Sequence, residues 1–427
     1  MKMKNILKYA ALAGLLLSAS ACLKDQHDIF EDTASARMQA FIENARTVLT
    51  GAEYGWRMEY FTHVGGYNYA LKFDNVQVTA SNEMKPGKTE TSYYKFTTDN
   101  GPVLTFDTYN EILHFFATPS SGDYEGKGGD FEFIILSAEP DEVVLKGKRS
   151  GYIARLYPLD RPVADYTRMI AEKIKNLLVL GFDCNLDGDT SVSGRFDLSE
   201  RVVVFGHYDQ DGVVIGEEVM ESFIYTETGV KLYEPLDVDG FLVSKFDIKD
   251  VPGEIITDND RITITAKPLP DSYLRFEEYA GTYSLTATGG PYTIQLEVYD
   301  EFDRVFEVKG LGNYEFFLYY DINTGNLEWD SNYIHQGEKL CSNGSYDVIM
   351  LGMDSNGSLT TSYSMKGLWN GDKENPVINF VSGTETATVV GFLLWNYSRE
   401  QGFGGQYTGS DYYPRDLRSV TSMRKIK

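Results

Sequence analysis

The sequence has few cysteines, histidines and basic residues for its length. Its 427 residues include 3 Cys and 5 His, with no Cys-x-x-Cys pair and no Cys/His cluster. A disulfide-stapled miniprotein is therefore excluded, and a zinc or thiol redox site has no support. The 39 Lys and Arg are outnumbered by 63 Asp and Glu, which gives a net charge of −24. Because such a charge repels phosphate groups, we expect no nucleic-acid partner.

The signatures of several common enzyme classes are missing as well. The sequence has no HExxH, no GxSxG and no GxxxxGK[ST], so zincins, α/β-hydrolases and P-loop enzymes have no support. His207 lies close to Asp209 and Asp211, but we interpret this segment as a strand end that runs into an Asp-Gly turn. With 63 acidic residues, chance pairs of carboxylates are expected throughout, so they identify no glycosidase site. We therefore assign no catalytic residue.

Long apolar runs are also absent. The run Ala10–Leu17 is far shorter than the roughly 20 residues of a membrane-spanning helix. It follows three lysines and precedes the small residues Ser18–Ala21, so residues 1–21 have the pattern of a secretory signal. Cys22 follows directly, as in a bacterial lipobox, although Ala19 stands where that box usually has Leu. We predict that Cys22 carries the lipid, diacylglycerol with palmitate; the alternative is ordinary cleavage that leaves Cys22 unmodified.

Two cysteines remain if Cys22 is lipidated. Cys184 and Cys341 lie far apart in the chain, in what we interpret as different domains. We expect two unpaired, partly buried thiols, although pairing is possible in an oxidising compartment.

Two stretches have the spacing of an amphipathic helix. From Phe30 to Leu49 apolar residues recur every three or four positions, with Thr33 or a polar neighbour placed to cap the start and Gly51 to end it. A second such run follows Pro162 and extends over 166–178. Most of the remaining chain consists of short aromatic and β-branched runs between Gly, Asn and Asp, which predicts antiparallel strands and hairpins.

The predicted fold is mainly β and falls into two parts. Residues 31–270 form an α+β region in which two helices pack on antiparallel sheet. The order of helix then strands occurs twice, at 31–160 and 161–270, so an internal duplication is possible. A Pro-rich linker at 267–271 precedes an all-β barrel or sandwich at 275–427, where no convincing helix is found.

One loop has the residues of a calcium site. Oxygen-bearing side chains alternate there and a glycine permits a sharp bend, as a hard cation requires: Asp183, Asn185, Asp187 and Asp189. The pattern departs from an EF-hand because Gly194 stands where a bidentate acid is needed, and 194–198 is typical of a strand. A calcium loop closed by a distant acid is one interpretation, and an Asx-rich turn without metal is the other.

Aromatic residues near the C-terminus are the other binding candidates. Sugar rings stack on exposed aromatic faces, and the Gly-rich segment 401–407 offers such faces in polar surroundings. The candidate ligand-binding residues are Trp395, Phe403, Tyr407, Tyr412 and Tyr413. The alternative is that these aromatics form the inward face of half-buried strands.

Several phrases of the sequence resemble one known family. They are Gly65–Phe73, Gly101–Asn110, Leu113–Phe116, Asp130–Leu136, Leu145–Lys148 and Thr226–Pro235. Together they resemble a Bacteroidota outer-membrane lipoprotein family known only as a domain of unknown function (family 4302), over about residues 22–270. The phrases Gly281–Leu285, Gly310–Gly312 and Tyr320–Leu327 resemble a small β module appended to such lipoproteins.

This resemblance implies a location and a setting, but no catalytic residues. Family members are outer-membrane lipoproteins, often found with nutrient-uptake systems built from a TonB-dependent porin and its lipoprotein partner. Residues 22–30 are then an acylated tether, and their Lys/Asp-rich start resembles the signal for export to the cell exterior. The alternative for this segment is a flexible, solvated tether without address information.

Two functions from different classes follow. The first is a non-catalytic cell-surface lipoprotein that binds a glycan, peptide or partner protein for nutrient uptake or adhesion. The second is a secreted surface hydrolase with an unrecognised acidic site, with or without the help of calcium. The absence of any nucleophile or metal signature favours the first.

Overall fold

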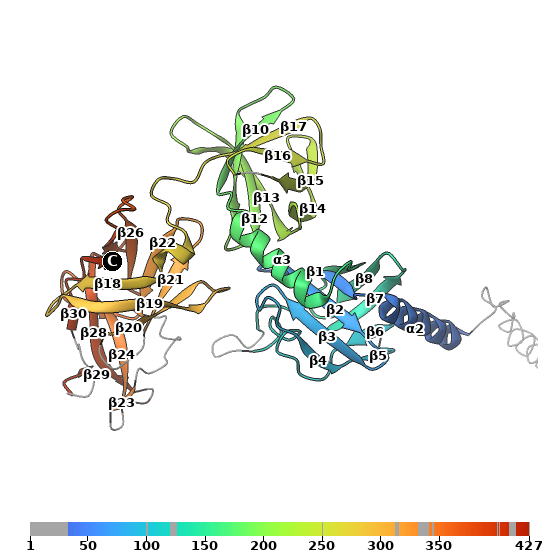
Figure 1. Cartoon of the computed structure of the whole chain (residues 1–427), viewed down its shortest axis with the longest axis horizontal. Helices are drawn as coiled ribbons and strands as arrows, with labels where there is room; N and C mark the ends of the chain where they lie inside the picture. The colour runs from blue at the N-terminus through green and yellow to red at the C-terminus, as the bar shows by residue number, and fades with distance from the viewer. Residues whose placement is uncertain are drawn as a thin grey trace, which may run out of the picture.

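The chain folds into three consecutive β-rich units, as seen in the computed structural model (Figure 1). The structure describes residues 33–426, with gaps at 100, 120–125, 250, 312–315, 332–340, 344–345, 399, 401 and 410–415. The predicted signal 1–21, the lipidation site Cys22, the tether 22–30 and the aromatics Tyr412 and Tyr413 lie outside the described residues. The prediction of a mainly β protein is confirmed.

The first unit is a nine-stranded antiparallel sheet in the order β4-β3-β2-β1-β9-β8-β7-β6-β5. Its strands are β1 (Trp56–Thr62), β2 (Gly65–Phe73), β3 (Gln77–Asn82), β4 (Glu90–Tyr93), β5 (Lys95–Thr97), β6 (Val103–Thr105), β7 (Glu132–Ala138), β8 (Val143–Gly147) and β9 (Ile153–Pro158). Neighbours in sequence are mostly neighbours in the sheet, so short hairpins build it. The join of β1 to β9 brings the two ends of the unit together.

Two helices cover the two faces of this sheet. Helix α2 (Ala34–Gly51) is capped by Thr33, whose Oγ1 accepts the backbone N–H of Ala36 at 3.2 Å, and it packs its buried face into the inner core. Helix α3 (Val163–Asn176) packs Tyr166 and Ile170 against Ala70 on the other face of β2. Strand β2 is therefore buried on both sides. No helix among the described residues has the length and apolar character that a membrane span requires.

The second unit is a closed eight-stranded barrel. It consists of β10 (Gly181–Leu186), β11 (Val192–Asp197), β12 (Val202–Tyr208), β13 (Val214–Tyr225), β14 (Gly229–Val238), β15 (Phe241–Ile248), β16 (Glu254–Thr257) and β17 (Ile262–Ala266). The pairing of β10 with β17 closes it. Its interior is filled by buried phenylalanines whose ring centroids lie 5.0–6.2 Å apart: Phe182, Phe196, Phe205, Phe223 and Phe246.

The repeated order of helix then strands is not a repeated architecture. Helix α3 packs on the first sheet rather than on the strands that follow it, and the first unit is an open sheet whereas the second is a barrel. The two similar phrases both form hairpins, β5–β6 and β13–β14, as expected. The two units therefore share a hairpin but not an architecture, and the internal duplication stays a prediction.

The third unit is a second closed eight-stranded barrel with an additional sheet against it. The barrel strands are β18 (Gly281–Thr286), β19 (Tyr292–Asp300), β20 (Val305–Lys309), β21 (Phe316–Asp321), β22 (Asn326–Asp330), β26 (Ser364–Trp369), β27 (Val377–Ser382) and β31 (Ser422–Lys425). The additional sheet contains β23 (Cys341–Asn343), β24 (Tyr346–Asp354), β25 (Leu359–Thr360), β28 (Val389–Ser398), β29 (Gly402–Gln406) and β30 (Asp416–Arg418). The expected barrel is present.

Two features of this unit were not expected from the sequence. A single helical turn, α4 (Phe276–Tyr279), precedes the barrel, and it is too short for a periodic pattern to reveal. Trp329 stacks between Phe316 of the barrel and Phe392 of the additional sheet, with centroid distances of 4.9 and 4.7 Å. These rings join the barrel to the additional sheet in one core.

Candidate functional site

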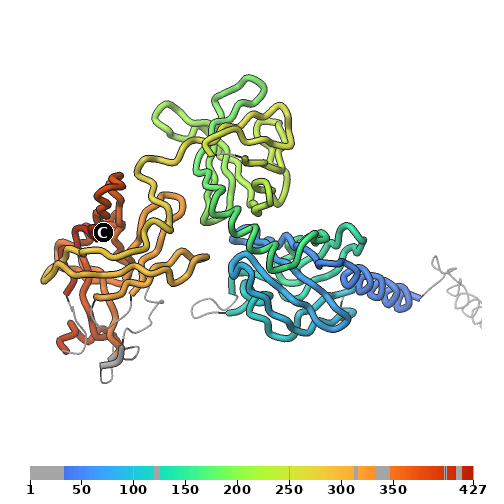
Figure 2. The backbone as a smooth tube through the Cα atoms, in the orientation of Figure 1, coloured from blue at the N-terminus to red at the C-terminus, as the bar shows by residue number. Residues whose placement is uncertain are grey.

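The three units meet at one place, and a turn of the third unit reaches into it. Figure 2 shows the β19–β20 hairpin extending from the third unit toward the first. At its tip Phe302 contacts the first unit, with its ring centroid 6.1 Å from those of both Tyr67 and Phe115. This junction combines residues that lie far apart in the sequence, such as Tyr67 and Phe302, which are more than two hundred positions apart.

A buried polar network holds the first two units together at the junction. Glu83 follows β3, and its Oε2 accepts the backbone and side-chain N–H groups of Asn68 at 3.1 and 2.8 Å. The same Asn68 amide donates to the Tyr225 carbonyl of the first barrel at 2.9 Å, and Tyr166 donates to Asn68 Oδ1 at 2.8 Å. Arg201 of the barrel completes the network through an ion pair with Glu83. Strands β2 and β13 and helix α3 are thereby fixed to one another.

Arg201 is the most enclosed cation of this network. The residue is 4% exposed, donates to the Gly66 carbonyl at 2.6 Å, and lies over the Tyr67 ring at 4.0 Å from the centroid. Burial alone would lower the pKa of Arg201, but the adjacent Glu83 carboxylate raises it above the usual value. The guanidinium therefore stays charged inside the protein, neutralised by a carboxylate from another unit.

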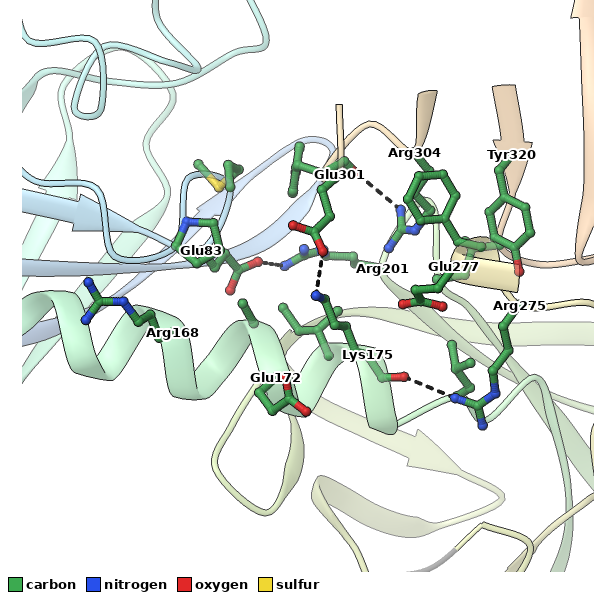
Figure 3. A pocket seen from close by; sticks show the side chains of 18 of the residues that line it. Glu83, Arg168, Glu172, Lys175, Arg201, Arg275, Glu277, Glu301, Arg304 and Tyr320 are labelled. Carbon is green, nitrogen blue, oxygen red and sulfur yellow. Dashed lines mark hydrogen bonds and ion pairs between the residues drawn. The ribbon is translucent and has the colours of Figure 1, made fainter. Parts of the chain in front are cut away.

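A cavity of about 350 Å³ opens beside this network and is lined by all three units (Figure 3). Its floor is largely apolar and aromatic, and consists of Met84, Leu178, Tyr273, Phe276, Phe302 and Tyr320. Its rim is charged and exposed, and consists of Arg168, Glu172, Lys175, Arg275, Glu277 and Glu301. We call this cavity the junction cleft. An apolar floor with a few polar groups is the usual composition of a small-molecule site.

The rim charges are partly paired across the units. Lys175 of α3 forms an ion pair with Glu301 of the third unit at 2.5 Å, which bridges the mouth (Figure 3). Arg275 donates to the Lys175 carbonyl at 3.5 Å. Glu277 lies on the same rim and is exposed to water. These exposed contacts are weak individually, so the mouth can open without a large cost.

Arg304 differs from the other cations of the junction cleft. Its guanidinium donates to the Phe302 carbonyl at 3.4 Å, and no carboxylate of the described residues forms an ion pair with it. Burial lowers the pKa of Arg304, and the nearby charge of Arg201 acts in the same direction. Arg304 also lines a second cavity of about 440 Å³, which shares Arg201, Phe302 and Tyr320 with the junction cleft, so Arg304 lies where the two cavities adjoin.

The predicted calcium loop is a tight hairpin turn between β10 and β11. Asp187 and Gly188 have φ of 54° and 102°, and Asn185 Oδ1 accepts the Gly188 N–H at 2.7 Å, as in an Asx turn. The carboxylates have partners other than a metal: Asp183 pairs with Lys267 at 2.9 Å, Asp187 pairs with Arg261 at 2.5 Å, and Asp189 accepts the Ser191 N–H at 2.9 Å. The described part of the chain holds no cluster of His, Cys, Asp or Glu suited to a metal ion. The turn interpretation therefore describes this segment.

The candidate aromatics are separated by the structure. Trp395 on β28 is half-buried, and Phe403 on β29 is 59% exposed, with its ring 5.4 Å from that of Tyr397. Tyr407 is 2% exposed and belongs to the core, so the prediction that it presents a face to a sugar is wrong. The inward-facing alternative holds for this residue because its ring packs in the core that joins the barrel to the additional sheet.

Two further side chains bear on the predicted chemistry. Cys184 is a free, buried thiol, as expected, and burial raises its pKa to about 11; the side chain of Cys341 is outside the described residues. His207 does not approach the acids that follow it. Its Nε2 lies 2.8 Å from Asp239 Oδ2, and its Nδ1 lies 3.0 Å from Ser191 Oγ, on the exposed side of the first barrel.

Two family models match this chain, one after the other. A family model described as a domain of unknown function (DUF4302) matches residues 26–250, which is more than half of the chain. The chain belongs to this family. A second model, also described as a domain of unknown function (DUF4987), matches residues 257–395, so the expected C-terminal module is confirmed. The DUF4302 match ends inside the first barrel, before β16 and β17.

Comparison with solved structures adds no functional argument for this DUF4302 protein. A transferrin binding protein B mutant from Haemophilus parasuis aligns at 10% identity over 77% of this chain and 65% of that chain, with a TM-score of 0.12. The DNA polymerase beta subunit of Streptococcus pyogenes aligns at 9% identity over 85% of both chains, with a TM-score of 0.09. The DNA polymerase III beta subunit of Pseudomonas aeruginosa aligns at 8% identity over 91% of this chain and 98% of that chain, with a TM-score of 0.10. No curated protein matches the chain.

No sequence pattern singled out Glu83, Arg201 or Arg304. The three residues belong to three units, and each is an ordinary charged residue in a turn when viewed locally. The one local signal is the positive φ of 54° at both Arg201 and Arg304, which backbone geometry reveals and residue type does not.

Proposed function

We propose that this protein is a non-catalytic surface lipoprotein that binds its ligand in the junction cleft. The observation that carries the proposal is the cleft itself, about 350 Å³ in volume and lined by all three units. Ligand sites are concave, mostly apolar and frequent where domains meet. The ligand classes that we consider are a glycan, a peptide or a segment of a partner protein, of which one terminal group would enter the cleft.

The anchoring part of the proposal rests on the N-terminal sequence. A basic start, a short apolar run and small residues before Cys22 support lipidation at that thiol. One acyl chain binds a membrane only weakly, so stable attachment needs at least two. The diacylglycerol and palmitate predicted at Cys22 would provide them. The resemblance described above supports a Bacteroidota outer-membrane location facing the exterior, beside a TonB-dependent uptake system.

The decisive experiment fills the cleft and asks whether binding is lost. The soluble mature chain, residues 25–427, is screened against arrays of glycans and peptides, and each hit is repeated with Ala171→Trp. Ala171 lines the cleft on α3, so an indole there occupies the cavity. Lys173→Trp is the control, because Lys173 is exposed on the same helix and does not line the cleft.

Each outcome decides the proposal. A hit that is lost in Ala171→Trp and kept in Lys173→Trp supports binding in the junction cleft. A hit that both variants keep places the ligand site elsewhere, with Trp395 and Phe403 as the next candidates. A blank array with the unmodified chain contradicts glycan and peptide binding.

The anchor has its own tests. Cells that express the full chain are labelled with a fatty-acid analogue, and the label should disappear in Cys22→Ala; a retained label contradicts lipidation at Cys22. Protease added to intact cells should digest the protein, whereas protection would place it on the inner leaflet.

Hydrolysis is the second candidate function, because one group of hydrogen-bonded side chains favours it. Ser191 Oγ, the His207 ring and Asp239 form a continuous hydrogen-bonded chain with contacts of 3.0 and 2.8 Å. In such a chain the imidazole would accept the proton of the serine hydroxyl as the oxygen attacks an ester carbonyl. Turnover of p-nitrophenyl acetate that is lost in both Ser191→Ala and His207→Ala would favour this candidate. Equal rates for the three proteins would remove it.

A further inference from the structure

We infer that the junction cleft recognises a small organic anion whose acidic group binds Arg304 and whose apolar body lies on the cleft floor. This inference rests on the proposed function, since it assigns the chemistry of the ligand in the same cleft. Two observations lead to it: an arginine that lacks an acidic partner and a floor that lacks free polar groups.

The donors of Arg304 are mostly unused. A guanidinium has five N–H donors in a planar fork that suits a carboxylate, sulfate or phosphate. Arg304 makes one long hydrogen bond, 3.4 Å to the Phe302 carbonyl, and pairs with no carboxylate of the described residues. Its side chain is half-buried and lines the cleft (Figure 3). A charged group partly withdrawn from water normally has a counter-charge, so Arg304 lacks the partner that its position calls for.

The nearby acids are already committed or are too exposed to serve. Glu83 neutralises Arg201 within the buried network, and Glu301 pairs with Lys175 at the mouth. Glu277 lies on the exposed rim, where water solvates it. Asp303 precedes Arg304 in the chain and interacts with it electrostatically, but it forms no ion pair with Arg304 and lines the second cavity rather than the cleft. The inner lining of the cleft therefore has two arginines, Arg201 and Arg304, for one carboxylate, and a bound anion would balance that charge.

The floor explains why the rest of the ligand should be apolar. Tyr273 and Tyr320 donate their hydroxyls to the backbone carbonyls of Ile322 and Leu274 at 2.7 and 2.9 Å. Met84, Leu178 and Phe276 offer no polar atoms except a thioether. Recognition by hydrogen bonds is thus concentrated at Arg304, while the floor contributes burial of apolar surface.

The test uses two fluorescent probes that differ in charge. Anilinonaphthalene sulfonate (ANS) has an aromatic body and a sulfonate, and N-phenylnaphthylamine has the same ring system without the acid. Both are titrated into the mature chain, Arg304→Gln, Ala171→Trp and Arg261→Gln. Arg261 is the control arginine, because it is exposed on the first barrel and pairs with Asp187.

We expect Arg304→Gln to weaken ANS binding by at least about tenfold, as expected for loss of a hydrogen bond to a charged group, and to change binding of the neutral probe by less than about twofold. Ala171→Trp should abolish binding of both probes, and Arg261→Gln should change neither. Displacement of ANS by naphthoate, naphthyl phosphate or naphthyl sulfate then ranks the acidic groups. The melting temperature of Arg304→Gln is measured as a control. A value equal to that of the unmodified chain shows that the fold is intact.

The outcomes separate this inference from the function that it extends. Equal ANS affinity in the unmodified chain and Arg304→Gln, with loss in Ala171→Trp, overturns the anion site and leaves the cleft as a binding site. Binding of both probes that Ala171→Trp does not affect places them outside the cleft and overturns both proposals. Failure of ANS to bind the unmodified chain, while the neutral probe binds, overturns the anion site alone.

Discussion

Replacing Arg201 with Met should loosen the first barrel from the first sheet. The variant leaves the Glu83 carboxylate buried without its cation and removes the arginine that lies over Tyr67. Glu83 is 3% exposed and Arg201 is 4% exposed, so water cannot replace the lost partner without opening the junction. Removal of one member of a buried ion pair costs about 3–5 kcal/mol. We expect a loss of that size in the free energy of unfolding.

The reference for this prediction is an ion pair on the barrel surface, in which the Glu218 side chain is 20% exposed and keeps a hydrogen bond from Tyr208 when the arginine is removed. Arg195 pairs with Glu218 at 2.5 Å, and the arginine side chain is 48% exposed. Arg195→Met should therefore cost less than about 1 kcal/mol. Glu83→Gln combined with Arg201→Met should recover part of the loss, because no unpaired charge is then buried.

Urea unfolding followed by tryptophan fluorescence and circular dichroism measures these effects. Trp56 is in the first unit, whereas Trp329, Trp369 and Trp395 are in the third, so separate transitions can be assigned by variants that lack Trp56. More than one transition is expected from three units, and each is analysed by itself. If Arg201→Met destabilises no more than Arg195→Met, the argument that this pair holds the junction is refuted.

Three other predictions concern the joints and the core. Asp197 accepts the side chain of Asn323 across the two barrels at 2.9 Å; burial raises its pKa, but backbone and Asn323 N–H donors outweigh that and lower it. Stability from Asp197 is present above its usual pKa and lost as pH falls through the lowered value, so Asp197→Asn should flatten acid unfolding between about pH 5 and pH 2. A Cβ at Gly66 would lie 2.8 Å from Ile224 Cβ, so Gly66→Ala should lower the melting temperature while Gly51→Ala does not; equal values contradict the close approach. Native Cys184 should resist iodoacetamide in peptide mapping and react after denaturation, and rapid native labelling would contradict its burial.

The elements that the sequence predicted are those whose signal is local. Thr33 and the apolar spacing after it predicted α2, and the short aromatic and β-branched runs between turn residues predicted antiparallel strands such as β21. The docking of α3 was not predictable, because its contact with Ala70 depends on a face of β2 that alternation alone leaves unassigned. Closure of the first barrel required the pairing of β10 with β17, about eighty residues apart, which no hairpin signal reports.

The candidate sites, too, could be predicted from the sequence only where the signal is local. Asp187 and Gly188 predicted a bend correctly, but the residues that favour an Asx turn are also those that bind calcium, so the sequence left both interpretations open. Tyr407 was misassigned because an aromatic in a Gly-rich segment has the same appearance whether it faces inward or outward. Arg304 drew no attention because its significance comes from missing partners, which only the folded arrangement reveals.

The end of the DUF4302 match has a practical consequence for anyone who divides this chain. The match ends at residue 250, yet the first barrel is closed only by β16 and β17, which end at Ala266. In a fragment cut at that boundary, β10 and β15 would each lose one of their two neighbouring strands, and phenylalanines of the barrel interior would become exposed. Unpaired strand edges beside apolar surface promote aggregation. Sequence-family borders and folding borders therefore differ here, and a soluble fragment should extend past the last barrel strand.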